Sequence, residues 1–372
     1  MKKIGIVYRY YPNWIGGTIY VYNLIRAIEL IAPNDIEVIL FIDSREEKFL
    51  DLTFKNLKYD LAYMDSNKNI RLLKKVLLYL FKIKIPRIYN KKLDAIFPLF
   101  NEWDFFSKTP KENQFYWIPD FQCFDMPHLF EKEDISKRKK QYLNTFMNAR
   151  KLVLSSESVE SHMKELFPHQ TFPKTHILRF ATFNDEIEDT DLHYFQIDRP
   201  FIICPNQFWG HKNQILVLKA IEYLNQDCLP FMVVFTGKEH DPRNEEHFQK
   251  NILPMLELPN VRRNVKSLGF IDRKVQLGLI QKSIGLVQPS KFEGWSTVIE
   301  DGMFFNKPIL ASNLKVNIEQ LDTKAKYFDV DDYRRLSDLL IVLYEQRGET
   351  TDFQYSEKQR QFGENFITMV NS

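Results

Sequence analysis

The sequence predicts an α/β protein with two domains, each built on a parallel sheet that helices cover. The chain has 372 residues, more than one hydrophobic core usually holds, which indicates two domains. Short apolar runs of strand length alternate with segments of helical apolar spacing, and this alternation occurs twice along the chain. The composition, 44% apolar and 27% charged, is typical of globular proteins and excludes a disordered or fibrous chain.

The first half of the chain predicts one such domain, over residues 1–185. A first strand over Lys3–Tyr8 is followed by a turn that contains Gly16 and Gly17, and then by a helix over Thr18–Leu30. The later apolar runs of strand length are Ile36–Ile42, Ala95–Pro98, Phe115–Ile118 and Leu152–Ser155. Because strands alternate with helices, we expect the strands to pair in parallel through right-handed crossovers.

The second half repeats this pattern, and we expect a second domain over residues 195–354. An acidic stretch without strong periodicity, Arg179–Pro200, is interpreted as the linker between the two domains. The predicted strands are Phe201–Cys204, Phe231–Thr236, Ile284–Pro289 and Ile309–Ala311. The predicted helices are Gln214–Leu224, Arg273–Gln281 and Thr297–Phe305.

The charge balance and the cysteines favour a cytoplasmic protein that does not bind nucleic acid. Lysine and arginine number 51 and aspartate and glutamate 49, so the net charge is only +2. Three scattered cysteines are too few for a disulfide framework and lack metal-ligand spacing. The apolar run Ile4–Tyr8 is too short for a signal peptide, and no run approaches the roughly 18 residues that span a bilayer.

One segment, Ser66–Leu93, is strongly basic. It contains nine lysine or arginine residues and no aspartate or glutamate, with leucines and a phenylalanine between the basic residues. A basic amphipathic helix is typical of segments that lie on an anionic membrane surface. A solvated helix that merely covers the sheet has a similar pattern, and the sequence leaves both interpretations open.

The segment Pro289–Met303 carries the sharpest functional signal. It follows a predicted buried strand and opens the predicted helix at Thr297. The first turn of a helix has unpaired N–H groups and a positive dipole end, which suit a diphosphate. Gly294 lets the backbone approach a ligand closely, and Glu293 precedes the helix where its carboxylate can face a cleft. The residues alone therefore predict an anion-binding loop.

This segment resembles the acidic signature of glycosyltransferase family 4 (glycosyl transferases group 1). These are retaining enzymes with the GT-B fold, in which two Rossmann-like domains face each other across a cleft. In the signature, Glu-Gly-aromatic is followed by a second carboxylate and then by Lys-Pro. Glu293 matches the first carboxylate, Asp301 the second, and Lys307–Pro308 the end.

The resemblance implies roles for the residues of this segment. Glu293 would contact hydroxyls of the donor sugar and Asp301 the ribose. The other predicted donor-binding residues here are Gly294, Trp295, Ser296 and Thr297. Glu300 has a structural interpretation instead, because Thr297 and Glu300 fit a capping box at the start of the helix.

Further loops of the second half fit the same family. Lys212, in a loop after a predicted strand, resembles the lysine that binds the donor diphosphate. His211 beside it is either a further hydrogen-bond donor or an ordinary surface histidine. The arginine usually found a few residues earlier is absent, and Gln207 lies near its place. Gly237 and Gly269 follow strands, where open α/β sheets bind ligands, although simple turns also favour glycine.

The first half carries two weaker matches. Gly16 and Gly17 resemble the glycine loop that approaches the donor diphosphate, but a tight turn alone would also need glycine. Pro119 occupies the position of a histidine that many relatives carry before an aspartate, and the aspartate is present as Asp120. Asp120 either orients the acceptor hydroxyl or only anchors its loop.

Two Asp-x-Asp sequences, 189–191 and 329–331, have the form that metal-dependent GT-A enzymes use to bind a metal. The first lies in the predicted linker, and the second lies where it could cap a helix. We therefore predict that neither binds a metal. The predicted enzyme needs no cofactor and uses a nucleotide sugar as co-substrate.

These matches predict a retaining glycosyltransferase that moves a sugar from a nucleotide sugar to a glycan. By resemblance, the donor binds the second domain, the acceptor binds the first, and residues 355–372 cross back to the first. The basic segment favours a lipid-linked acceptor at the inner face of a bacterial membrane, in lipopolysaccharide or capsule synthesis. The absent histidine and arginine leave open a catalytically weak subunit that binds a partner enzyme or a glycan. A sugar-nucleotide epimerase is a third interpretation.

Overall fold

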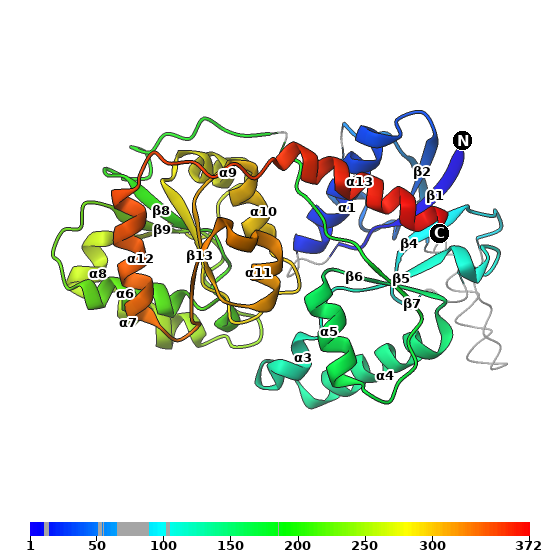
Figure 1. Cartoon of the computed structure of the whole chain (residues 1–372), viewed down its shortest axis with the longest axis horizontal. Helices are drawn as coiled ribbons and strands as arrows, with labels where there is room; N and C mark the ends of the chain where they lie inside the picture. The colour runs from blue at the N-terminus through cyan, green and yellow to red at the C-terminus, as the bar shows by residue number, and fades with distance from the viewer. Residues whose placement is uncertain (11–14, 51–53, 55, 65–88, 102–104, 185) are drawn as a thin grey trace.

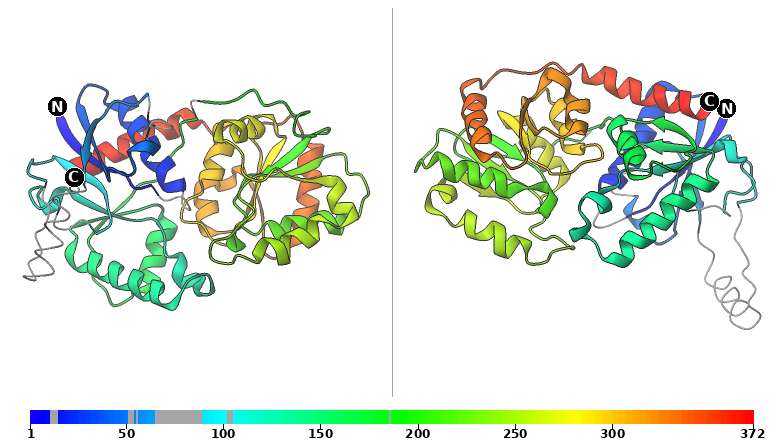
Figure 2. Two further views of the ribbon diagram at one scale, coloured as in Figure 1. Left: turned by 180° about the vertical axis from the view of Figure 1, so that it is seen from behind. Right: turned by 60° about the horizontal axis from the view of Figure 1, so that its bottom comes forward.

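The computed structural model of the chain contains two parallel sheets, each covered by helices, in two units that lie side by side (Figure 1). It describes residues 1–10, 15–50, 54, 56–64, 89–101, 105–184 and 186–372. Seen from two other directions, the same units are joined by the linker and by the C-terminal helix (Figure 2). The predicted α/β fold class is therefore confirmed.

The first sheet has seven parallel strands in the order β3-β2-β1-β4-β5-β6-β7. Its strands are β1 (Lys2–Val7), β2 (Ile36–Ile42), β3 (Asp60–Tyr63), β4 (Ala95–Leu99), β5 (Gln114–Ile118), β6 (Lys151–Leu154) and β7 (Lys174–Ile177). The central strand β1 pairs on both sides, with Ile4 opposite both Val38 and Ala95. Helices on both faces bury the central strands, which explains their nearly continuous apolar runs.

The second sheet has six parallel strands in the order β10-β9-β8-β11-β12-β13. Its strands are β8 (Phe201–Cys204), β9 (Met232–Phe235), β10 (Val265–Ser267), β11 (Gly285–Gln288), β12 (Ile309–Ser312) and β13 (Lys326–Phe328). Both sheets reverse their strand order once, between β1 and β4 and between β8 and β11. In doubly wound sheets, ligands bind beyond the carboxyl ends of the strands at such a reversal point.

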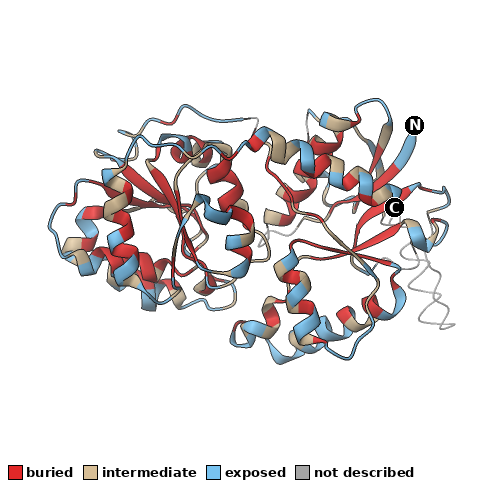
Figure 3. Ribbon diagram, viewed as in Figure 1, coloured by how far each residue is buried: buried red, intermediate tan, exposed pale blue. Residues whose placement is uncertain are grey.

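Helices pack on both faces of each sheet, and the buried residues follow the strands and the inward sides of the helices (Figure 3). The helices are α1 (Ile15–Ile31), α3 (Gln122–Asp125), α4 (Lys132–Asn148), α5 (Glu157–Leu166), α6 (Gln214–Leu224), α7 (Leu253–Leu256), α8 (Pro259–Asn264), α9 (Arg273–Lys282), α10 (Thr297–Phe304), α11 (Lys315–Leu321), α12 (Tyr333–Glu345) and α13 (Tyr355–Asn371). The helices and strands named from the sequence all occur, with ends that differ by at most a few residues.

The linker and the last helix connect the two units. Between Ile177 and Phe201 the described residues form no helix or strand, yet Phe180 is buried. Helix α13 packs along α1, and a Cβ at Gly363 would lie 2.6 Å from the carbonyl oxygen of Ala27. Only glycine therefore allows this close approach of the two helices.

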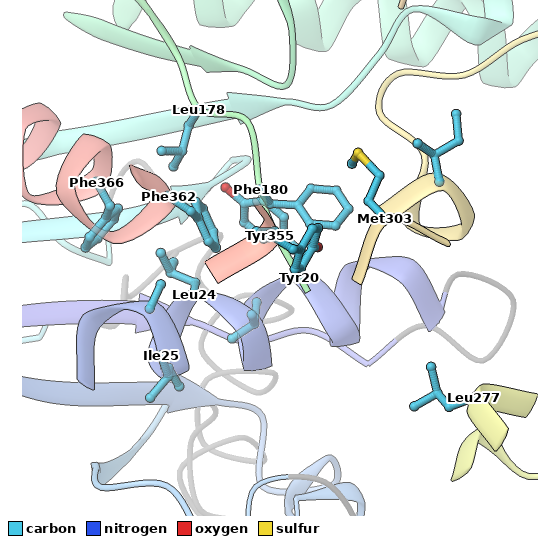
Figure 4. Close-up of a cluster of buried hydrophobic side chains, with 14 of the residues drawn as sticks. Tyr20, Leu24, Ile25, Leu178, Phe180, Leu277, Met303, Tyr355, Phe362 and Phe366 are labelled. Carbon is cyan, nitrogen blue, oxygen red and sulfur yellow. The ribbon is translucent and has the colours of Figure 1, made fainter. Parts of the chain in front are cut away.

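Aromatic side chains from three segments meet where the units join (Figure 4). Tyr20 of α1 contacts Phe180 of the linker and Phe362 of α13, with ring centroids 5.5 and 6.1 Å apart respectively. Met303 of α10, from the second unit, belongs to the same hydrophobic cluster. The core is thus continuous through the hinge, which fixes where α10 lies relative to the first sheet.

Residues 66–88 of the basic segment Ser66–Leu93 lie outside the described part of the chain. The amphipathic helix expected there therefore stays a prediction. In the part of the chain that the structure describes, no helix is both long and apolar enough to cross a bilayer.

Candidate functional site

An ion pair between Lys212 and Glu293 lies at the reversal point of the second sheet. Lys212 comes from a short 3₁₀ turn (Gly210–Lys212) after β8, and Glu293 from the loop after β11. The Lys212 ammonium is 2.7 Å from Glu293 Oε1, and the two side chains are only 16% and 9% exposed. Two residues that the sequence analysis selected separately are thus partners in one partly buried pair.

A buried amide that the sequence analysis did not select holds Glu293 from the other side. Gln288, the last residue of β11, is fully buried. Its amide nitrogen donates to Glu293 Oε1 at 2.7 Å and to Ser296 Oγ at 2.8 Å, while its oxygen accepts from Asn206 Nδ2 at 2.6 Å. All three bonds use the amide in one orientation, so the direction of the Glu293 carboxylate is fixed. The sequence signal that could have revealed Gln288 is a polar residue at the end of an apolar strand.

The helix that follows Glu293 begins differently from the prediction. Ser296, not Thr297, is the N-cap of α10, and its hydroxyl accepts from the backbone N–H of Ile299. The predicted capping box of Thr297 and Glu300 is therefore wrong, because Ser296 already occupies the capping position. No described residue accepts from the backbone N–H of Thr297 or Val298, so the helix keeps donors that suit an anion.

Glu300 instead ties α10 to the hinge. Its carboxylate accepts from Trp295 Nε1 at 2.9 Å, from the amide of Gln320 at 2.6 Å, and from the hydroxyl of Tyr355 at 2.6 Å. The Trp295 indole also donates to the carbonyl of Phe180 in the linker. The side chain of Trp295, predicted to bind the donor, is thus engaged with the hinge. Burial raises the pKa of Glu300 from about 4.5 to about 7.

This raised pKa predicts that the protein loses stability as the pH rises. Between pH 4.5 and 7 the folded protein holds a proton on Glu300 that the unfolded chain has released. The free energy of unfolding should therefore fall through this window, by roughly 3 kcal/mol in total. Glu300→Gln should remove this part of the slope and retain activity.

Chemical denaturation at several pH values measures this effect. Glu222→Gln, a change at an exposed glutamate of α6, should keep the slope of the wild type. An identical slope in the wild type and in Glu300→Gln would show that Glu300 does not titrate in this window.

Asp301, the next residue of α10, is also buried but has different partners. Its Oδ1 accepts from Arg273 Nη2 at 2.5 Å and from Asn184 Nδ2 at 3.2 Å. Its Oδ2 is buried and has no partner among the described residues. The sequence analysis assigned different roles to Asp301 and Glu300, and the two carboxylates do have different partners: Arg273 and Asn184 for Asp301, and the hinge residues for Glu300.

The other predicted loops of the second sheet meet each other. The backbone N–H of Gly237 donates to the carbonyl of Gly269 at 2.7 Å, and both glycines have positive φ. A Cβ at Gly237 would lie 2.3 Å from the carbonyl oxygen of Asn206, so this turn presses against the loop after β8. Gln207, near the place of the absent arginine, accepts from the backbone N–H of Lys238 and stabilises the same contact.

The first sheet contributes Asp120 from the loop after β5. A Cβ at Gly294 would lie 2.6 Å from the carbonyl oxygen of Pro119 and 3.0 Å from Asp120 Cβ. The Asp120 loop and the Glu293 loop therefore touch across the two units. Burial raises the pKa of Asp120, while its Oδ1 accepts from the backbone N–H of Gln122. Asp120 both anchors its loop and lies beside the Glu293 loop.

Gly16 and Gly17 lie in the first turn of α1 rather than in a loop before it, which corrects the predicted start of that helix. Glycine is tolerated there because the first N–H groups of a helix have no intrahelical partners. Residues 11–14, which precede them, lie outside the described part of the chain. The role of the two glycines at the donor stays a prediction.

His211 is buried beside Lys212, and its partner is Arg243, which the sequence analysis did not select. Arg243 Nη2 is 2.9 Å from His211 Nδ1, and Arg243 Nη1 donates to Gln122 Oε1 of the first unit at 3.1 Å. Burial and the adjacent cations lower the pKa of His211 well below its ordinary value. The imidazole is therefore kept neutral, and its burial distinguishes it from an ordinary surface histidine.

A cavity of about 180 Å³ lies between the two units and has Glu293 in its wall. The first unit lines it with α3 and α5 residues, including Asp125 and His162, whose side chains are 3.1 Å apart. Nearby, Glu319 of α11 accepts from the backbone N–H of Ser158 at 2.9 Å and so ties the two units together. The two units thus leave a cavity beside Glu293, and polar contacts near this cavity join the units.

Comparison with known proteins shows what the second unit resembles. Residues 189–366 match the family described as Glycosyl transferases group 1. The second unit is thus similar to this glycosyltransferase family, over just under half of the chain. The matched residues include Lys212, Glu293, Asp301 and the beginning of α13. A comparison with curated protein sequences gives no match.

Solved glycosyltransferases share the fold of the whole chain. A glycosyltransferase from Rickettsia africae is 13% identical with a TM-score of 0.62, over 100% of this chain and 96% of that chain. HepE from Anabaena, in complex with UDP and glucose, is 14% identical with a TM-score of 0.63, over 100% and 98%. The lipopolysaccharide outer core galactosyltransferase WaaB is 13% identical with a TM-score of 0.58, over 99% of both chains. These likenesses confirm the GT-B fold.

The Asp-x-Asp sequences of this glycosyltransferase fold have local partners. Asp189 pairs with Lys282 at 2.5 Å, and Asp331 with Lys291 at 3.4 Å. The N-cap of α12 is Asp332, the residue after the second sequence. Among the described residues, no group of three or more His, Cys, Asp or Glu side chains could hold a metal ion.

Proposed function

We propose that the protein is a retaining glycosyltransferase that moves a sugar from a nucleotide sugar to a glycan acceptor. The observation that carries the proposal is the partly buried pair of Lys212 and Glu293, 2.7 Å apart, beside the Asp120 loop of the other domain. A cation and a carboxylate in one cleft can bind the diphosphate and the sugar of a nucleotide sugar. The family match over residues 189–366 supports this function, as does the fold shared with HepE bound to UDP and glucose.

In this proposal, the C-terminal domain binds the donor. The diphosphate lies at the start of α10, where the N–H groups of Thr297 and Val298 have no acceptor among the described residues. Lys212 offsets the charge that develops on the departing nucleotide. Asp301 Oδ2, which has no described partner, accepts from a ribose hydroxyl.

Glu293 and Asp120 act on the sugar and the acceptor in this proposal. Glu293 orients the donor sugar, because Lys212 and Gln288 hold its Oε1 in a fixed direction. The acceptor enters from the N-terminal domain through the cavity that Glu293 lines. Asp120, whose loop touches Gly294 of the Glu293 loop, orients the acceptor hydroxyl.

Nucleotide release tests the proposal. The protein is incubated with UDP-, GDP- and other sugar nucleotides and with glycan acceptors, and the released nucleotide and the anomeric configuration of the product are measured. Acceptor-dependent release with retained configuration is expected. Binding of a glycan or a partner enzyme without any release would instead favour a catalytically weak subunit. Conversion of one sugar nucleotide to another without an acceptor would favour an epimerase.

We further propose that the acceptor is lipid-linked and belongs to a bacterial surface polysaccharide. The charge of Ser66–Leu93 supports this, with nine basic and no acidic residues, because anionic headgroups attract each basic residue by about 1 kcal/mol. WaaB, which has this fold, is a lipopolysaccharide galactosyltransferase. The protein should bind anionic vesicles at low salt and dissociate at high salt. If the protein does not bind anionic vesicles even at low salt, this proposal fails and a soluble acceptor is favoured.

The reaction should not require a metal. In this proposal Lys212 and the start of α10 supply the positive charge that a divalent ion gives in other transferases. EDTA should leave the rate of nucleotide release unchanged. Activity that EDTA abolishes and that Mg²⁺ or Mn²⁺ restores would contradict this expectation.

A further inference from the structure

Arg243 is held by contacts from both domains. Within its own domain, its backbone N–H and its Nε donate to the fully buried Asp241 carboxylate, at 3.0 and 3.4 Å. In the other domain, the guanidinium of Arg243 donates to the side-chain amide of Gln122 and lies 5.5 Å from the ring centroid of Phe130. The position of this side chain is therefore strongly determined, although the residue lies in an irregular loop.

The contact between Arg243 and His211 can be made in only one way. A guanidinium has donors and no acceptor and stays protonated, so His211 Nδ1 must accept from Nη2 at 2.9 Å. A neutral imidazole that accepts at Nδ1 carries its proton on Nε2. No described residue accepts from His211 Nε2, and this atom is not among the buried atoms that lack a partner. The residue next to Lys212 therefore has an N–H donor that no described residue accepts, at an atom that is not fully buried.

We propose that Arg243 is a positioning residue that fixes the Nε2–H tautomer of His211, so that the imidazole donates a hydrogen bond to the diphosphate of the donor. This inference rests on the proposed function for the identity of the ligand. It assigns the arginine a role through His211, distinct from the direct contact expected of the absent arginine near Gln207.

The surroundings of His211 agree with a neutral donor. The ring packs against Trp209, whose ring centroid is 5.7 Å away, and Lys291 donates its backbone N–H to the His211 carbonyl. The nearby charges are the cations Lys212 and Arg243 and, behind Arg243, the Asp241 carboxylate. Burial and the two cations lower the pKa of His211, so the ring stays neutral at physiological pH.

Nuclear magnetic resonance of ¹⁵N-labelled histidine rings tests the tautomer without any substitution of Arg243. The eight histidines give separate signals, and the signal lost in His211→Gln identifies His211. In the wild type this ring should show the neutral Nε2–H form from pH 5.5 to 8. A ring that carries its proton on Nδ1, or that is protonated at pH 7, would overturn the inference.

Arg243→Gln tests the role through the tautomer and the activity together. Without the arginine, neutral His211 can place its proton on either nitrogen, so its ring signals should show a mixture of the two neutral forms. The kcat/KM for the donor should fall roughly tenfold. In a His211→Gln background, Arg243→Gln should cause no further loss. A loss of the same size with and without the His211 ring would mean a merely structural arginine.

Arg262→Gln, at an exposed arginine of α8, is the matched control and should keep both the kcat/KM and the His211 tautomer of the wild type. The spectrum and the transfer assay separate the two proposals. A wild type with the Nε2–H form but without sugar transfer would refute the proposed function and support the tautomer. A wild type that transfers sugar with the other tautomer would refute the role of Arg243 alone.

Discussion

Glu293→Ala should lower the turnover number for sugar transfer by about 10² or more, because it removes the group that positions the donor sugar. The Glu293 carboxylate is 9% exposed and is held from two sides, by Lys212 and by Gln288, each 2.7 Å from Oε1. Its direction is thus set before a donor binds, which is the condition for a large effect on the transition state. Steady-state nucleotide release with saturating donor and acceptor measures the effect.

The protein should remain folded in this variant. Glu293 lies in a loop, but its loss leaves Lys212 and one N–H of the Gln288 amide without an acceptor, so we expect a cost of roughly 1–3 kcal/mol in stability. The exposed pair Lys250–Glu246 is a matched control, because its charged atoms are 2.6 Å apart but its side chains are 66% and 68% exposed. Glu246→Ala should leave turnover unchanged, and near-normal turnover in Glu293→Ala would refute the assigned role.

The limits of the fold prediction follow from where strands lie in the sheets. All the strands that the sequence analysis named lie inside the two sheets, where both faces are covered and the chain is continuously apolar. The four strands that it did not name, β3, β7, β10 and β13, are the edges of the sheets. They are three or four residues long and partly exposed, so they carry almost no apolar signal.

The limits of the site prediction follow from distance along the chain. Glu293 and Lys212 could be selected because each lies in a motif of adjacent residues. The partners that orient the site come from far away in the sequence, as when Arg243 contacts Gln122, 121 residues earlier. Glu300 shows a second limit, because spacing alone suggested a cap where the structure has a buried contact with Tyr355, 55 residues later. Local patterns identify the loops, whereas only the fold decides which side chains meet.

Gly294→Ala should lower turnover by about 10², although it removes no chemical group. A Cβ at this position would lie 2.6 Å from the backbone oxygen of Pro119, in the opposite domain. Backbone atoms cannot give way as a flexible side chain does, so the two loops must separate. A misplacement of about 1 Å between reacting groups can cost this much in rate. The φ of Gly294 is not in the left-handed region, so alanine adds no backbone strain and each domain should keep its stability.

Gly210→Ala provides the matched control for this contact between the domains. It adds the same methyl group in a neighbouring loop of the same domain, but there the nearest atoms, in Asp241 and Leu129, lie 3.9 Å away. This distance is an ordinary van der Waals contact, so turnover should be unchanged. Nucleotide release compares the two variants, and thermal unfolding checks that both are folded. Equal turnover in Gly294→Ala and Gly210→Ala would show that the contact between the Asp120 and Glu293 loops is not needed during catalysis.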